Sequence, residues 1–228
     1  MEEKQSRDEP WAEVAFRLAE LAEDRIDYQT AQVYYDRAIQ LAPDNGFYLN
    51  EAGSLANTLS KYDTAIEFFE KALALVLKTH GPDHSDVATS WSNLGIAWKY
   101  KGQYDKAIVY YEKALASHLK SFGLEHPKVA TCWSNLGGVW ANKDDYDKAI
   151  DYYQKALASD IKTFGPEYPT VAIRWNNMGG AWAHKGVHNK AMSYYEMALP
   201  VFEKASLDHM VRFVKGNIAS LKKQSGEQ

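Results

Sequence analysis

The chain has 228 residues, and its hydrophobic fraction of 46% is high enough to bury a core, which excludes a globally disordered protein. Its 26 basic and 30 acidic residues give a net charge of -4, which disfavours nucleic acids and anionic membranes as partners. The first residues lack an apolar signal segment, no long apolar run occurs, and the single cysteine, Cys132, cannot form an internal disulfide, so we expect a soluble cytoplasmic protein.

The chain opens with a short helical repeat. Residues 1–10 are polar and are expected to be disordered, whereas residues 11–44 carry the pattern of a helical hairpin. Tyr28 precedes Tyr62, which holds the same position in the next repeat, by 34 residues. The matching positions of this first repeat are filled by Ala31, Tyr35, Ala38 and Pro43.

Four longer repeats follow, at residues 45–86, 87–128, 129–170 and 171–210. The second and third of these are identical at 27 of 42 positions. Six of the seven tryptophans occupy two positions of the repeat, namely Trp91, Trp133 and Trp175, and Trp98, Trp140 and Trp182. Self-similarity at a fixed period of this length predicts an array of stacked repeats.

Each repeat is predicted to be a pair of helices, because its apolar residues recur three and four positions apart. Gly102 breaks the chain between two such helices, and Gly123 stands where a left-handed helix end is expected. Small residues are expected where paired helices approach most closely, at Gly53, Gly95, Gly137 and Gly179. Aromatic residues are expected to pack in the core as Tyr35, Phe69, Tyr111, Tyr153 and Tyr195.

The last segment is predicted to be a capping helix at residues 211–223, followed by a disordered tail at residues 224–228. It aligns with the first helix of the preceding repeat, but both tryptophan positions hold lysine, Lys215 and Lys222. Charge at these positions prevents a further hairpin from stacking and keeps the end of an array hydrated.

This pattern resembles the tetratricopeptide repeat, in which tryptophan, Leu-Gly and an aromatic residue precede a helix with Ala, an aromatic residue and Ala. Residues 11–44 match the 34-residue form, and the 42-residue repeats are similar to those of kinesin light chains. The resemblance implies an all-α, right-handed α-solenoid of five helical hairpins plus the capping helix, with a concave face formed by the first helices. It also implies a non-enzymatic scaffold that binds a protein or peptide segment in the concave groove.

One asparagine position recurs along the expected concave face without a packing reason. Asparagine is unfavourable inside helices, and its carboxamide can pair with the backbone of an extended peptide. In related repeats, asparagines at this position contact bound peptide backbone. The predicted groove residues are Asn93, Asn135, Asn177, Asn217, Ser92, Ser134, Asn176, Asn50, Glu51, Lys99, Tyr100, Asn142 and His184.

The asparagine series also allows two interpretations without a ligand, and both stay open. Recent duplication could have copied it without a binding role, or the side chains could bond to neighbouring hairpins. Acidic residues gather towards the amino-terminal end of the expected groove, which would suit a ligand with basic residues or simply form a solvated face; these are Glu20, Glu23, Asp24 and Glu51.

Motifs for catalysis or cofactor binding are absent, so we expect no enzyme and no cofactor. His80, Asp83, His84 and Asp86 resemble a metal site, but later repeats lose these histidines, and we interpret the cluster as linker packing. The alternative function is self-association through the first hairpin around Trp11, or through outer aromatics at Tyr110, Tyr152 and Tyr194, although a monomer is favoured.

Overall fold

The computed structural model describes residues 2–82 and 84–225, and it places eleven α-helices and no strand in them. The chain divides into two compact units, residues 1–117 and 118–228. The first unit holds α1 (Glu2–Asp24), α2 (Tyr28–Leu41), α3 (Gly46–Thr58), α4 (Tyr62–His80), α5 (Ser85–Tyr100) and most of α6 (Tyr104–Phe122). The second holds the end of α6, α7 (Pro127–Asn142), α8 (Tyr146–Phe164), α9 (Pro169–His184), α10 (His188–Lys204) and α11 (Asp208–Ser225).

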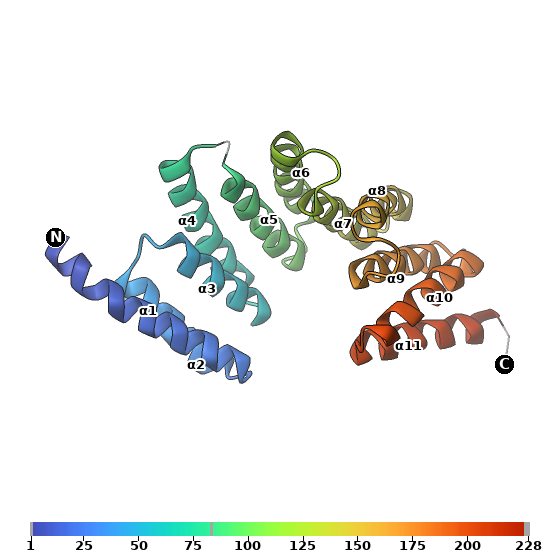
Figure 1. Cartoon of the computed structure of the whole chain (residues 1–228), viewed down its shortest axis with the longest axis horizontal. Coiled ribbons are helices and arrows are strands. Elements are labelled where there is room, and N and C mark those ends of the chain that lie inside the picture. The colour runs from blue at the N-terminus through green and yellow to red at the C-terminus, as the bar shows by residue number, and fades with distance from the viewer. Residues whose placement is uncertain (1, 83, 226–228) are drawn as a thin grey trace. The chain divides into compact units, whose positions relative to one another are not determined.

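Consecutive helices form hairpins, as the pairs α1–α2 and α3–α4 of the first unit illustrate (Figure 1). Each hairpin is closed by a tight turn in which one residue adopts a left-handed conformation, with φ of 78° at Gly102 and 61° at Asp144. The next residue can begin the second helix with a side-chain cap, as Asp145 does by accepting a hydrogen bond from the backbone N–H of Lys148. The all-α solenoid of hairpins expected from the repeat is confirmed.

The close approach predicted at the small residues is present. A Cβ atom added to Gly95 on α5 would lie 2.7 Å from the ring of Tyr111 on α6, and one added to Gly179 would lie 2.6 Å from the ring of Tyr195. The five core aromatics are buried as expected, at Tyr35, Phe69, Tyr111, Tyr153 and Tyr195. Glycine at these positions therefore sets the distance between the paired helices, because any larger side chain would displace a buried ring.

The ends and the outer aromatics differ from expectation. The segment 1–10, expected to be disordered, is helical from residue 2, because its many Glu, Lys, Gln and Arg residues favour a helix. The capping helix runs from Asp208 to Ser225, so only residues 226–228 of the expected tail lie outside the described residues. The outer aromatics expected to be exposed are half-buried instead, at Tyr110, Tyr152 and Tyr194.

In the three repeats that contain two tryptophans, the second one is not a fully buried core residue. The ammonium groups of Lys106, Lys148 and Lys190 each lie 4.0 Å from the ring centroid of such a tryptophan. The rings covered in this way are half-buried, at Trp98, Trp140 and Trp182. A cation over an indole face is attractive, so these lysines shield apolar surface that the fold leaves open.

Candidate functional site

The asparagine series makes one bond between hairpins. Asn93 on α5 donates from Nδ2 to Oδ1 of Asn50 on α3, at 3.3 Å. This bond realises, for these two residues, the inter-hairpin bonding that the sequence left open. A carboxamide carries two donor hydrogens and an acceptor oxygen, so one such bond leaves Asn93 with capacity for a ligand.

A hollow of about 440 Å³ lies beside Asn93 in the first unit, and we call it the Asn93 hollow; its lining includes Asn57, Tyr62, Asn93, Ile96 and Tyr100. The rings of Tyr62 and Tyr100 stack with centroids 6.1 Å apart, and Tyr100 is 56% exposed. Oδ1 of Asn57 is buried and has no hydrogen-bond partner among the described residues. The hollow thus offers an aromatic shelf beside amide groups.

Lys99, also predicted for the groove, is half-buried beside the same shelf. Its ammonium nitrogen lies 5.6 Å from the ring centroid of Tyr100. Burial lowers the pKa of Lys99, because the charged form loses hydration there.

The acidic residues of the first hairpins come together as the sequence indicated. They surround a hollow of about 600 Å³, the Glu51 hollow, which is lined by Arg17, Glu20, Leu21, Glu23, Asp24, Tyr35 and Glu51. Burial raises the pKa of Glu51, and the nearby carboxylates of Glu23 and Glu20 raise it further. Tyr35 donates from its hydroxyl to the carboxylate of Glu23 at 2.9 Å, so a hydrogen bond within the protein already occupies one of these carboxylates.

In the second unit, five of the predicted groove residues line a single hollow of about 600 Å³, the Asn177 hollow: Asn142, Asn176, Asn177, His184 and Asn217. They come from α7, α9 and α11. The rings of His184 and Tyr146 stack at 5.5 Å, and Tyr146 donates from its hydroxyl to Asp144. Tyr153, Tyr195 and Phe213, which the sequence did not indicate as groove residues, also line the hollow.

Two groups in the Asn177 hollow have unusual surroundings. Asn176 is 9% exposed, and its Oδ1 atom is buried without a hydrogen-bond partner among the described residues. Burial raises the pKa of Tyr153 to about 12, so its hydroxyl stays neutral. An unpaired buried amide oxygen costs about 1–3 kcal/mol, which a bound donor could recover after the side chain turns.

The remaining predicted residues serve the fold or lie away from the hollows. Ser92 donates to the backbone carbonyl of Ala88 at 3.1 Å. Ser134 is buried and accepts a hydrogen bond from Nη1 of Arg174 at 2.7 Å, so it is unavailable to a ligand. Asn135 is half-buried and lines none of the four hollows that we describe.

The sequence did not predict the buried ion pair behind Ser134. Nε of Arg174 on α9 lies 2.8 Å from Oδ2 of Asp160 on α8, with side chains 10% and 1% exposed. Arg174 occupies the position that is Ser90 and Cys132 in the two preceding repeats, and Asp160 occupies that of His118. A basic residue and an acidic residue that replace uncharged residues at repeat positions on the successive helices α8 and α9 are the signal that could have revealed the pair.

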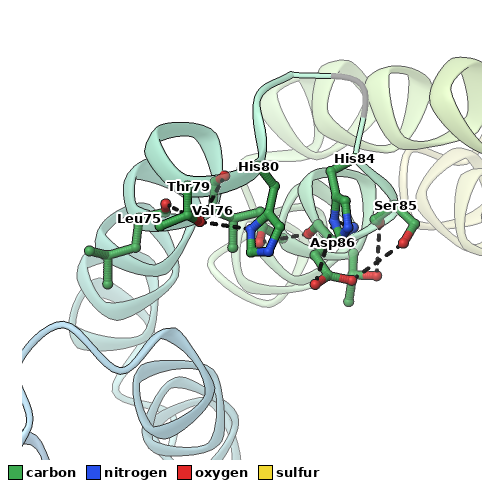
Figure 2. A network of polar contacts seen from close by, with 9 residues as sticks. Leu75, Val76, Thr79, His80, His84, Ser85 and Asp86 are labelled. Carbon is green, nitrogen blue, oxygen red and sulfur yellow. Dashed lines mark hydrogen bonds and ion pairs between the residues drawn. The ribbon is translucent and has the colours of Figure 1, made fainter.

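The metal-like cluster is part of the connection between α4 and α5 (Figure 2). The rings of His80 and His84 pack with centroids 4.3 Å apart, and Nδ1 of His84 accepts from the backbone N–H of Asp86 at the start of α5. The later connections hold the same ring pair as Phe122 with His126 and Phe164 with Tyr168. Residue 83 lies outside the described residues, within which no group of three or more metal-binding side chains was found. The contacts support the interpretation as linker packing.

No helix among the described residues combines the length and the apolar character needed to cross a bilayer. Models of the tetratricopeptide repeat match residues 12–45, 46–117, 98–158 and 129–204. No curated protein sequence matches the chain.

Several solved structures share the fold. BtubC (BKLC) from P. vanneervenii has 22% sequence identity and a TM-score of 0.70, covering 91% of this chain and 92% of its own. A putative kinesin light chain from Podospora anserina, with nearly identical TPR-like repeats, has 19% identity and a TM-score of 0.68, covering 82% and 89%. MamA has 21% identity and a TM-score of 0.57, covering 86% and 93%.

Proposed function

The chain belongs to the tetratricopeptide repeat family, and from this membership we propose that it is a non-enzymatic scaffold whose hollows bind a peptide segment of another protein. Proteins of this family generally act through protein partners. The observation that carries the proposal is the Asn177 hollow, where carboxamides from three successive first-position helices, α7, α9 and α11, surround one open space.

The chemistry of this hollow suits a peptide backbone. Asn142, Asn177 and Asn217 each provide a donor and an acceptor, and the backbone of an extended peptide offers the complementary groups at regular intervals. The rings of His184 and Tyr146 provide a flat surface on which an apolar or planar side chain of the ligand can rest. Asp144 is the carboxylate in the lining, so the site also tolerates a basic residue of the ligand.

The proposal is tested by replacing Asn177 and Asn217 together with alanine. We expect helicity and melting temperature to stay almost unchanged, because both side chains are only partly buried and alanine favours helices. Capture of partners from a lysate should be lost, as measured by affinity purification with cross-linking mass spectrometry. Cross-links of the unaltered chain should map to α7, α9 and α11.

The matched control is Asn189→Ala, on the exposed surface of α10. It makes the same chemical change outside the hollow and should leave capture intact. If the double variant captures the same partners as the unaltered chain, the carboxamides do not bind the ligand and the proposal is wrong.

A second candidate function, self-association, is favoured by the exposed face of α1. Its apolar stripe is 66%, 48%, 38% and 53% exposed at Trp11, Val14, Leu18 and Leu21. The same repeat positions on α5 are buried, at Val87, Ser90, Leu94 and Ala97. On α5 these positions are covered by the preceding helix α4, and the described residues hold no such helix before α1.

Light scattering distinguishes this candidate. If the stripe associates, the apparent mass should exceed 25.8 kDa and rise with concentration. Replacing Val14 and Leu18 with glutamate should then restore the monomer mass, because a charge on each stripe opposes burial. A mass that stays at the monomer value at every concentration contradicts self-association.

A further inference from the structure

A larger hollow, of about 1030 Å³, lies in the first unit where the 34-residue repeat meets the first 42-residue repeat. We call it the Thr79 hollow; its lining includes Leu41, Pro43, Phe47, Leu75, Val76 and Thr79. This hollow arises because the helices that meet there differ in length. α2 has 14 residues whereas α4 has 19, and α3 has 13 whereas α5 has 16. At 1.5 Å per residue, the end of α4 extends about 7 Å beyond what α2 can cover.

The equivalent surface of the second unit is covered by the turn that connects α6 and α7. On α8, Ser159 donates from Oγ to the carbonyl oxygen of Leu124 at 3.4 Å, and Thr163 donates from Oγ1 to that of Glu125 at 3.0 Å. The side chain of Glu125 also forms an ion pair with Lys162. A long second helix of this repeat therefore binds a short non-helical segment through hydroxyl groups and one lysine.

Two repeats earlier, the positions of Ser159, Lys162 and Thr163 are Leu75, Lys78 and Thr79 on α4. No described residue of the connection between α2 and α3 forms a hydrogen bond with α4. Thr79 instead donates from Oγ1 to the carbonyl oxygen of its own helix at Leu75, at 2.9 Å, and lies 2.7 Å from Nδ1 of His80 (Figure 2). Lys78 has no carboxylate partner among the described residues. The groups that hold the segment on α8 are thus present on α4, but the connection between α2 and α3 lines the hollow without bonding to them.

Burial along the same face agrees with a missing cover. Val76 is half-buried, whereas the residues at the same position on the later second helices are 3%, 1% and 0% exposed, at His118, Asp160 and Phe202. An apolar side chain placed over Leu75 and Val76 would bring this position to the burial found elsewhere in the chain.

We propose that the Thr79 hollow binds a short non-helical segment of a partner protein that carries an apolar residue followed by a carboxylate residue. The apolar side chain packs on Leu75 and Val76, a backbone carbonyl accepts from Oγ1 of Thr79, and the carboxylate pairs with Lys78. Glu9, Glu13, Asp44 and Asp86 also line the hollow. These four carboxylates disfavour a segment with any acidic residue beyond the one that pairs with Lys78. This site is separate from the Asn93 and Asn177 hollows and does not depend on them.

The test uses the chain's own linker as the probe. The octapeptide SFGLEHPK, residues 121–128, carries the Leu-Glu pair that α8 binds within the chain. Fluorescence anisotropy of the labelled peptide, titrated with the full chain, should show saturable binding. Replacing the glutamate of the peptide with lysine should weaken binding roughly fivefold, the size expected when an exposed ion pair becomes a repulsion.

Variants of the full chain show where the peptide binds. Lys78→Glu should weaken binding of the native peptide roughly fivefold as well, and it should improve binding of the peptide that carries lysine in place of glutamate. Thr79→Val should weaken binding of both peptides, because it removes the hydroxyl that donates to the backbone carbonyl of the peptide. Lys71→Glu is the matched control, since Lys71 is an exposed lysine of α4 that pairs with Glu67 on the same helix, and it should leave binding unchanged.

Three outcomes would overturn the proposal. The first is the absence of saturable binding by the native peptide, and the second is an equal effect of the Lys78 and Lys71 variants. The third is a dimer in light scattering that Lys78→Glu converts to a monomer, which would assign the hollow to a second copy of the chain. None of these results depends on Asn177 or Asn217, so failure here and failure of the proposed function are distinguishable.

Discussion

Replacing Asp160 with alanine should lower the free energy of unfolding of the second unit by about 3–5 kcal/mol, the cost of leaving a buried charge without its partner. Arg174 lies in a position where small side chains stand in the two preceding repeats, and its guanidinium is 2.8 Å from Oδ2 of Asp160 and 2.7 Å from Oγ of Ser134. With the carboxylate removed, Ser134 alone would compensate the buried cation.

The measurement is urea unfolding followed by circular dichroism at 222 nm. Asp151→Ala, at an exposed position of the same helix, is the matched control and should change stability by less than about 0.5 kcal/mol. Replacing Asp160 and Arg174 together with leucine should recover most of the loss, because a buried ion pair is often no more stabilising than apolar residues of similar volume. If Asp160→Ala is as stable as the Asp151→Ala control, the ion pair between Asp160 and Arg174 does not stabilise the fold.

Lowering the pH from 6.5 to 4 should destabilise the chain through His118 by up to about 3 kcal/mol. His118 is 3% exposed, and its Nδ1 atom has no hydrogen-bond partner among the described residues. Burial lowers the pKa of His118 from 6.5 to about 4, and the positive charges of Lys128 and His126 contribute to the same shift. The unfolded chain therefore takes up a proton near pH 6.5 that the folded chain accepts only near pH 4, so the stabilisation is present above pH 6.5 and is lost as the pH falls.

His118→Phe isolates this contribution. Phenylalanine does not titrate, and the same repeat position on α10 already holds a buried phenylalanine, Phe202. The difference in unfolding free energy between pH 7.5 and pH 4.5 should be smaller for this variant than for the unaltered chain by about 2–3 kcal/mol. His209→Gln, at an exposed position of α11, should keep the original pH dependence. Identical pH profiles for all three proteins would mean that His118 is protonated equally in both states.

Part of the candidate site could be predicted from the sequence, and part could not. The positions of Asn177, Asn217 and His184 follow from the repeat period, and the structure places them in one hollow. Ser134 occupies an equally regular position but is taken by Arg174. Whether Ser134 is available to a ligand depends on the single residue Arg174, which lies 40 residues away in the next repeat. No other repeat has an arginine at that position.

The sequence by itself determined the number and pairing of the helices, the glycine positions of closest approach and the aromatic core. These features are local or recur at a fixed period, so the spacing of apolar and small residues encodes them directly. Only the tertiary structure decided which polar side chains remain free. The bond between Asn93 and Asn50 and the Thr79 hollow arise where two different repeats meet, and they depend on side-chain direction and relative helix length across that junction. No periodic pattern specifies these quantities, because each is a property of a pair of neighbouring repeats.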